Sequence, residues 1–298
     1  MPVLIPENAR ILVQGMTGKA GTFYTRLAMD YGTGETGGYV AGVTPGRGGT
    51  THLGLPVFGT VVEAVRETAP DAGVVYAPAP VAADAMLEAI EAGISTVVCV
   101  TERVPVLDMV RVRAALQGSG TALVGPNSQG VLIPGHRKAG VMSTADALPG
   151  GIGVAARSAS LTSEVVAQLS AAGLGQSATV GIGGDPVHGI GFAHCLDLFR
   201  DDPATEAVVL VGELGGVEEE EAADFLAAED YGKPVVALLV GRHAPEDRRM
   251  GHAGTVSVLG SASLAQKMAL LEAAGVRLAA SPGEVPRLLA DAGVATPR

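Results

Sequence analysis

The sequence predicts an α/β fold of two tandem domains, each built around a parallel β-sheet. Short aliphatic runs alternate along the chain with helical patterns of about 10–15 residues, and this alternation is typical of βαβ units. Glycine or proline stands at most of the joints between the two kinds of segment. The length of 298 residues fits two domains of ~100–200 residues each.

The first domain is expected over residues 1–125. Its strands are predicted at 11–13, 39–43, 73–76, 96–100 and 122–124. Helical patterns at 22–30, 81–92 and 105–117 lie between them. Such strands, each a continuous apolar run, are typical of a parallel sheet that is covered by helices on both faces.

The second domain is expected over residues 126–298, after a stretch at 125–150 that is interrupted by glycine and proline. Its strands are predicted at 153–155, 178–180, 207–211, 235–240 and 276–279, and its helices at 162–172, 217–228 and 264–274. The acidic run at 218–221 is interpreted as the solvated first turn of a helix, where carboxylates suit the positive end of the helix dipole.

Composition excludes several classes of protein. Aromatic residues are only 3% of the chain and the formal net charge is −11, which argues against a nucleic-acid partner. No apolar run reaches ~18 residues, so no membrane partner is expected. Cys99 and Cys195 show no disulfide or metal spacing, and the N-terminal segment lacks a signal-peptide pattern. We therefore expect a cytoplasmic protein.

A glycine-rich turn follows the first predicted strand. Gly15, Gly18 and Gly21 are spaced by three residues, which allows a phosphate to approach the start of the following helix. The spacing differs from that of the dinucleotide fingerprint, and Arg47 follows the second strand where that fold places an acidic residue. Arginine there favours a phosphorylated ribose, which NADP and coenzyme A both carry. The alternative is a structural turn without a ligand.

A histidine and a carboxylate are the candidate catalytic residues. His252 lies among small residues and near cations, where an imidazole is accessible to an anion. Glu213 directly follows a predicted strand, at the edge where ligands of α/β sheets gather. A carboxylate can fix the tautomer of a nucleophilic histidine. The alternatives are an ordinary loop histidine and a solvated strand end. No histidine pair has metal-ligand spacing, so no metal is expected on this chain.

The motifs together resemble those of the α subunits of succinyl-CoA synthetase, the ADP- or GDP-forming succinate–CoA ligase. They are, in chain order, Gly15-Met16-Thr17-Gly18-Lys19-Ala20-Gly21, Gly125-Pro126-Asn127, Gly181-Ile182-Gly183-Gly184-Asp185-Pro186, Gly212-Glu213-Leu214-Gly215-Gly216 and Gly251-His252-Ala253-Gly254. The resemblance covers nearly the whole chain. It implies a Rossmann-like CoA-binding domain followed by a flavodoxin-like ligase domain.

The resemblance also implies roles for individual residues. His252 matches the histidine that is phosphorylated, and Glu213 matches the carboxylate that orients it. The positions that match coenzyme A contacts are Thr17, Gly18, Lys19, Ala20, Arg47, Val100, Thr101 and Glu102. Ser158 and Ser160 match the start of the helix that receives the phosphoryl group. Backbone N–H groups and the helix dipole suit that task.

The family reaction has three steps and needs a partner. A nucleotide phosphorylates the histidine, the phosphoryl group passes to a carboxylic acid, and the CoA thiol then displaces phosphate from the acyl phosphate. The resemblance implies a β subunit with an ATP-grasp fold that holds ATP or GTP with Mg²⁺, in an αβ or (αβ)₂ assembly. The other partner is a small carboxylic acid.

The sequence departs from the family pattern near the acid substrate. Where the family has Gly-Pro-Asn-Cys-Pro-Gly, this sequence keeps the asparagine as Asn127 but has Ser128 and Gln129 in place of the cysteine and the second proline. Ala159 replaces a glycine, and Ser163 replaces a tyrosine that contacts substrate in the family. The resemblance implies that the product is succinyl-CoA or a related acyl-CoA, and these departures suggest an acid other than succinate, bulkier or more hydroxylated. The alternatives are a catalytically weakened CoA-binding or regulatory subunit and an NADP-dependent oxidoreductase, although no Tyr-x-x-x-Lys pair for the latter is found.

Overall fold

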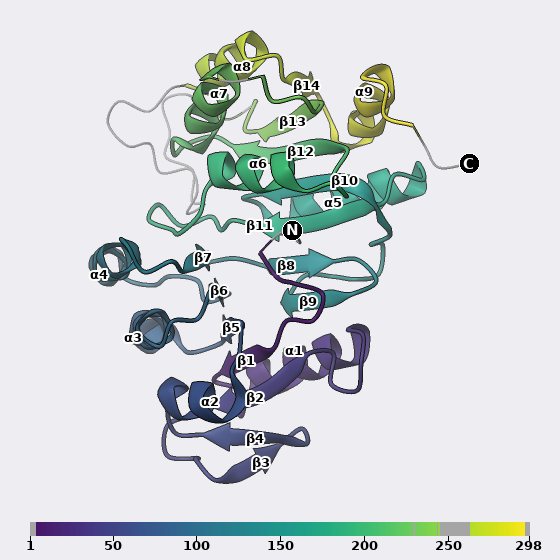
Figure 1. Ribbon diagram of the computed structural model, residues 1–298. Helices are drawn as coiled ribbons and strands as arrows, with labels where there is room; N and C mark the ends of the chain where they lie inside the picture. The colour runs from purple at the N-terminus through teal and green to yellow at the C-terminus, as the bar shows by residue number, and fades with distance from the viewer. Residues whose placement is uncertain (1–3, 229, 243, 245–262, 296–298) are drawn as a thin grey trace.

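A computed structural model describes residues 4–228, 230–242, 244 and 263–295. The strands of this described part form two seven-stranded sheets, each flanked by helices (Figure 1). The first sheet contains β1 (Ile11–Gln14), β2 (Tyr39–Val43), β3 (Thr50–His52), β4 (Leu55–Phe58), β5 (Ala72–Val75), β6 (Thr96–Cys99) and β7 (Ala122–Val124). Their order in the sheet is β3-β4-β2-β1-β5-β6-β7. The strands before β5 are added on one side of β1 and the later strands on the other side, so the topological switch point lies between β1 and β5.

Four helices belong to the first sheet. They are α1 (Lys19–Tyr31), α2 (Val61–Thr68), α3 (Ala79–Glu91) and α4 (Val106–Leu116). Helix α2 begins with a capping box: Thr60 accepts a hydrogen bond from the Glu63 N–H, and the Glu63 side chain accepts one from the Thr60 N–H. Helix α1 instead begins at Gly18 without a side-chain cap, which leaves its first backbone N–H groups available at the edge of the sheet.

The second sheet contains β8 (Gly130–Ile133), β9 (Arg137–Gly140), β10 (Pro149–Ala156), β11 (Gln176–Gly181), β12 (Ala207–Glu213), β13 (Val235–Val240) and β14 (Arg277–Ala279). Its order is β14-β13-β12-β10-β11-β8-β9. The helices around it are α5 (Ala159–Ala171), α6 (Phe192–Asp201), α7 (Glu218–Ala228), α8 (Leu264–Ala273) and α9 (Val285–Asp291), the last preceded by a short 3₁₀ turn. The strand order reverses at β10 and β12, which places their carboxyl ends at a position where ligands bind in such sheets.

The predicted α/β fold with two tandem parallel sheets is confirmed, and antiparallel strands are added at the sheet edges. Strand β3 runs antiparallel to β4, and the β8–β9 hairpin joins β11 in antiparallel register. The stretch at 125–150, in which we predicted no strands, contains this hairpin. No helix in the described part of the chain combines the length and the hydropathy that crossing a bilayer requires.

One hydrophobic cluster spans the two sheets, and each sheet also has a cluster of its own. A single cluster of buried residues includes Val13 and Val74 of the first sheet together with Val131 and Val180 of the second. The β8–β9 hairpin forms the edge of the second sheet nearest the first sheet, and β9 packs against α1 (Figure 1). Two tyrosines of the first sheet reach it: the Tyr39 hydroxyl donates to the Lys138 carbonyl at 2.7 Å, and the Tyr76 hydroxyl donates to the Gly140 carbonyl at 3.2 Å.

Candidate functional site

The glycine-rich turn after β1 is built by close backbone packing. Gly15 has φ +81°, and a Cβ atom at Gly21 would lie 2.2 Å from the Gly15 carbonyl oxygen. Only glycine therefore allows α1 to begin so close to the end of β1. The four residues that we expected at a ligand stand at this corner, with Thr17 half-buried and Gly18, Lys19 and Ala20 exposed.

The loop after β2 lies against the same corner. The Thr17 and Thr44 hydroxyls are hydrogen bonded at 3.2 Å, and Thr22 and His52 are joined by a 2.8 Å hydrogen bond. Arg47 lies in this loop with an exposed side chain. Its backbone is fixed locally, since its N–H donates to the Thr44 carbonyl at 3.0 Å. A phosphate at the start of α1 would therefore have a cation on the neighbouring loop.

The third predicted ligand segment follows β6, at the same edge of the first sheet. Val100 and Thr101 are half-buried and Glu102 is exposed. The Thr101 hydroxyl donates to the Ala77 carbonyl at 2.6 Å, which ties this segment to the end of β5. The three segments thus follow β1, β2 and β6 of one parallel sheet, where carboxyl ends share an edge.

Asn127 connects this edge to the second sheet. Its N–H donates to the Thr101 carbonyl at 2.9 Å, and its side-chain Nδ2 donates to Asp185 Oδ1 at 2.9 Å. Burial raises the pKa of Asp185, and the Asn127 hydrogen bond acts in the opposite direction. Asn127 has φ +55°, a left-handed conformation that asparagine tolerates better than most residues. The expected substrate residue is therefore also a structural link between the two sheets.

Glu213 ends β12 with its side chain buried, 3% exposed. Its Oε1 lies 3.5 Å from Arg157 Nε. A Cβ atom at Gly184 would lie 3.5 Å from Asn127 Nδ2 and 4.0 Å from Glu213 Oε1. The loops after β7, β10, β11 and β12 thus converge on Gly184. His252, the other predicted catalytic residue, lies outside the described residues.

Helix α5 begins directly after Arg157. Ser158 is the N-cap residue but makes no capping hydrogen bond with its side chain, whose Oγ lies 3.5 Å from Ser160 Oγ. Ala159 and Ser160 are exposed and Ser163 is half-buried, with its hydroxyl 3.4 Å from the Ala159 carbonyl. This helix start therefore presents backbone N–H groups that no capping side chain occupies, as an anion site requires.

Ser128 and Gln129 are buried rather than open to a ligand cavity. The Ser128 hydroxyl donates to the Gly181 carbonyl and accepts the Gly130 N–H, which joins β8 to β11. Gln129 is 6% exposed and packs against Gly181, and its Nε2 donates to no acceptor in the described part of the chain. Ser128 thus has a structural role, whereas the buried Gln129 Nε2 has no hydrogen-bond acceptor among the described residues.

The acidic run at 218–221 is a helix start, but our prediction that it is solvated is wrong for its first two residues. Glu218 is 6% exposed and Glu219 only 1%. Glu218 accepts the Phe192 N–H at 3.0 Å and pairs with His188 at 2.9 Å, whereas Glu219 accepts the Glu213 N–H at 3.0 Å. Burial is offset here by specific partners, of which Phe192 and His188 lie far from Glu218 in the sequence. The missed signal is the position of the run directly after a strand-end glycine turn.

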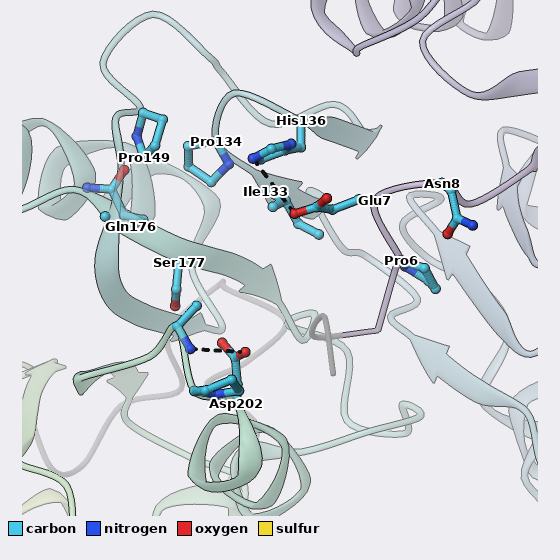
Figure 2. A pocket seen from close by; sticks show the side chains of 13 residues that line it. Pro6, Glu7, Asn8, Ile133, Pro134, His136, Pro149, Gln176, Ser177 and Asp202 are labelled. Atoms are coloured by element: carbon cyan, nitrogen blue, oxygen red, sulfur yellow. Dashed lines mark hydrogen bonds and ion pairs between the residues drawn. The ribbon is translucent and has the colours of Figure 1, made fainter.

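An open pocket lies elsewhere in the molecule (Figure 2). It measures about 530 Å³ and is lined by Glu7 and His136 together with Gln176, Ser177 and Asp202. These residues stand near the amino ends of β10 and β11, opposite the edge that carries Glu213 and Ser158. No predicted site residue of the described part of the chain lines this pocket.

Comparison with known proteins matches both halves of the chain. A family model described as a CoA binding domain matches residues 6–103, and one described as CoA-ligase matches residues 155–277. The succinate–CoA ligase [ADP-forming] α subunit of Staphylococcus aureus (strain Mu50) is 47% identical over 292 residues, which are 98% of this chain and 95% of that protein. The chain belongs to the family of succinate–CoA ligase α subunits.

A further member of the succinate–CoA ligase α-subunit family, α subunit 2 of Archaeoglobus fulgidus, is 45% identical over 291 residues, which are 98% of this chain and 99% of that protein. The resemblance that the motifs predicted is thereby confirmed. The first family model spans Thr17, Arg47 and Thr101, which supports coenzyme A over NADP as the phosphorylated ribose ligand. The second spans Ser158, Glu213 and His252.

The fold is shared with larger enzymes. The ATP citrate lyase of Methanothrix soehngenii, solved with citrate and coenzyme A, superimposes with a TM-score of 0.84 at 23% identity. A dinucleotide-forming acetyl-coenzyme A synthetase from Ca. Korarchaeum cryptofilum gives 0.74 at 20% identity. These comparisons cover 99% and 93% of this chain, which spans 53% and 59% of those chains. The α subunit thus corresponds in fold to roughly half of such an enzyme.

Proposed function

We propose that the chain is the α subunit of a nucleotide-dependent acid–CoA ligase that works through phosphorylation of His252. The observation that carries the proposal is the placement of Glu213. Its carboxylate ends β12 and lies beside the loops that precede α5 and contain Asn127, in a family member whose histidine motif is retained. A buried carboxylate suits the task of holding an imidazole in one tautomer.

The reaction divides among the residues as follows. A ring nitrogen of His252 attacks the terminal phosphorus of a nucleotide and releases the diphosphate. Glu213 accepts a hydrogen bond from the other ring nitrogen and stabilises the developing positive charge. The N–H groups at Ser158, Ala159 and Ser160 bind the phosphoryl oxygens. A substrate carboxylate oxygen then attacks phosphorus, which frees the histidine, and the CoA sulfur attacks the acyl carbon and expels phosphate.

The coenzyme A site is proposed at the edge of the first sheet. Thr17, Gly18, Lys19 and Ala20 supply the start of α1, and Arg47 supplies a guanidinium for a ribose phosphate. Val100, Thr101 and Glu102 complete the edge. We propose that residues 1–125 bind coenzyme A and residues 126–298 carry the phosphoryl chemistry. The Asn127 links to Thr101 and Asp185 would hold the two parts together.

The nucleotide, ATP or GTP with Mg²⁺, is assigned to a β partner with an ATP-grasp fold, in an αβ or (αβ)₂ complex. This assignment follows from the family alone. We also propose a cytoplasmic location, because Cys99 and Cys195 are both free thiols, which a reducing compartment maintains.

The acid substrate is proposed to be succinate or a related dicarboxylate, and the replacement at Ser163 favours a bulkier or hydroxylated one. Ser163 lines a small recess with Leu132, Met142 and Asp146, where a tyrosine would occupy far more volume. Retention of both His252 and Glu213 favours an active enzyme over a weakened regulatory subunit.

The proposal is tested by intact-mass analysis of the complex of this chain with its β partner, before and after incubation with ATP or GTP. The expected result is one added phosphoryl group on this chain, absent in His252→Ala. Equal phosphate incorporation in the His252→Ala chain would overturn the assignment. A panel of dicarboxylates, assayed for acyl-CoA formation with the same complex, then identifies the acid.

A further inference from the structure

Three charged side chains form a buried cluster behind the Glu213 loop. Arg157 directly follows β10, Glu219 lies in the first turn of α7, and Lys267 lies in the first turn of α8. Their side chains are 5%, 1% and 0% exposed. Helices α7 and α8 lie side by side and pack against one face of the second sheet (Figure 1). The sequence motifs assign no role in the reaction to Glu219 or Lys267.

Glu219 is the centre of this cluster. Its Oε1 lies 3.2 Å from Arg157 Nη1, and its Oε2 lies 2.5 Å from Lys267 Nζ. The same Oε1 accepts the backbone N–H of Glu213 at 3.0 Å. One buried carboxylate therefore holds two cations and the main chain of the proposed orienting residue.

The two cations bind the rest of that loop. Lys267 Nζ donates to the carbonyls of Gly215 and Gly216 at 2.9 and 3.0 Å. Arg157 Nη1 donates to the Gly215 carbonyl at 2.7 Å and to the Glu213 carbonyl at 3.3 Å. The backbone of residues 213–216 is thus bound at four polar groups by the three side chains.

The glycines of the loop fit the cluster. A Cβ atom at Gly212 would lie 2.5 Å from Glu219 Oε1, and one at Gly216 would lie 3.0 Å from Arg157 Nη2. Gly215 and Gly216 both have positive φ, which L side chains rarely adopt. The Gly212–Gly216 turn is therefore shaped in part by the buried charged side chains of Glu219 and Arg157.

Burying charges is costly, and apolar residues of the same volume often stabilise a protein equally well. A buried ionic cluster whose side chains form hydrogen bonds with the backbone of one loop instead selects a single conformation of that loop. We propose that Glu219 and Lys267 are positioning residues: they hold the 213–216 loop, and with it the Glu213 carboxylate, in the arrangement that phosphorylation of His252 requires. This inference rests on the proposed function.

The geometry also links two parts of the ligase domain. Lys267 belongs to α8, the first described helix after the segment that contains His252. Its contacts fix the beginning of α8 to the loop that carries Glu213. The cluster therefore holds the start of α8, which follows the segment that contains His252, next to the loop that carries Glu213.

The test is a double-mutant cycle on the complex with the β partner. The rate of phosphorylation of this chain by ATP is measured for wild type, Glu213→Gln, Lys267→Met and the double variant. We expect Lys267→Met to slow phosphorylation at least 10-fold in the wild-type background and to have less than a 2-fold effect in the Glu213→Gln background, because a residue that acts through another loses its effect when the other is changed. The KM for coenzyme A should stay unchanged.

Lys233→Met is the matched control. Lys233 Nζ also donates to two backbone carbonyls, those of Phe199 and Asp202, at 2.6 and 2.7 Å, but at the opposite end of the second sheet. This variant should lower the unfolding temperature and leave the phosphorylation rate unchanged. If Lys267→Met fails to fold, Glu219→Gln takes its place in the same cycle, since an amide keeps one acceptor for the Glu213 N–H.

The outcomes separate the two proposals. Equal losses for Lys267→Met in both backgrounds, or a loss no larger than that of Lys233→Met, overturn the positioning role. A wild-type complex that incorporates no phosphoryl group, or a Glu213→Gln variant that is phosphorylated at the wild-type rate, overturns the proposed function of Glu213 itself, and the positioning role with it.

Discussion

Asn127 Nδ2 donates a 2.9 Å hydrogen bond to Asp185 Oδ1, and this bond joins the last loop of the first sheet to the glycine-rich loop after β11. Both residues lie where the carboxyl edges of the two sheets meet. The backbone N–H of Asn127 meanwhile donates to Thr101, so one residue contacts segments from both proposed sites.

Replacement of Asn127 separates its two contributions. Asn127→Ala loses the hydrogen bond to a carboxylate and places alanine at φ +55°, and should lower the free energy of unfolding by about 2–3 kcal/mol. Asn127→Gly loses the bond alone and should be about 1 kcal/mol more stable than Asn127→Ala. Denaturant unfolding of the three chains provides the measurement. Equal stability of the two variants would show that the backbone conformation contributes nothing.

The pH dependence of stability should reveal Asp185. Burial raises its pKa above the ordinary 3.8, so the folded state binds a proton more readily than the unfolded state. The resulting stabilisation is fully present below pH 3.8 and is lost as the pH rises through the folded-state pKa. Asp185→Asn, which keeps an acceptor for Asn127, should therefore gain stability relative to wild type as the pH rises from 3 to 7. A constant difference across that range would contradict the assignment.

Arg47 should recognise the ribose phosphate of coenzyme A. Arg47→Ala is expected to weaken coenzyme A binding about 10-fold, which corresponds to ~1.4 kcal/mol, by loss of a charge-assisted contact. Titration with coenzyme A and with 3′-dephospho-coenzyme A distinguishes the contact, because the second ligand should bind both chains alike. Arg66→Ala, an exposed arginine on α2 paired with Glu67, serves as the control and should bind like wild type.

The first glycine turn should not tolerate a methyl group at Gly21. A Cβ atom there would lie 2.2 Å from the Gly15 carbonyl, so Gly21→Ala must displace the start of α1. We expect coenzyme A binding to fall by more than 10-fold and the unfolding temperature to drop. Gly73→Ala is the matched control, because its Cβ would meet nothing closer than 3.8 Å, at Ile94. Normal coenzyme A affinity in Gly21→Ala would remove this turn from the proposed site.

The choice of acid should respond to Ser163. Ser163→Tyr restores the residue of the family pattern and reduces the recess next to Met142 and Asp146. Its kcat/KM for succinate should rise relative to that for hydroxylated dicarboxylates, whereas Ser163→Ala, which keeps the recess open, should leave the preference unchanged. The ratio of the two specificity constants is the measurement. An unchanged ratio in Ser163→Tyr would place acid selection elsewhere.

The buried parallel strands were predictable because each is a continuous apolar run, as in β12 and β13. The β8–β9 hairpin was not, because β9 buries Arg137 and Lys138. Arg137 is accommodated by a hydrogen bond to the Thr33 carbonyl at 2.7 Å, a partner about a hundred positions away in the chain. The pattern of apolar and polar residues around β9 does not indicate a partner so distant in the sequence.

The candidate site shows the same division. Glu213 was predictable from its place at a strand end, and the fold puts it at the edge of the sheet as expected. Glu219 and Lys267 were not, because an acidic run and a lone lysine are normally solvated. Their burial depends on a contact between α7 and α8 that appears only when the sheet order is known.

The β8–β9 hairpin also determines how separable the two halves are. It is hydrogen bonded to the second sheet, yet its outer strand packs on α1 and accepts hydrogen bonds from Tyr39 and Tyr76 of the first. Separating the chain after residue 125 would expose β9, which buries Arg137 and Lys138. It would also divide the hydrophobic cluster that spans the two sheets. The proposed boundary between residues 125 and 126 therefore does not divide the hydrophobic packing of the chain. The shared cluster predicts that the two sheets stabilise each other and unfold together.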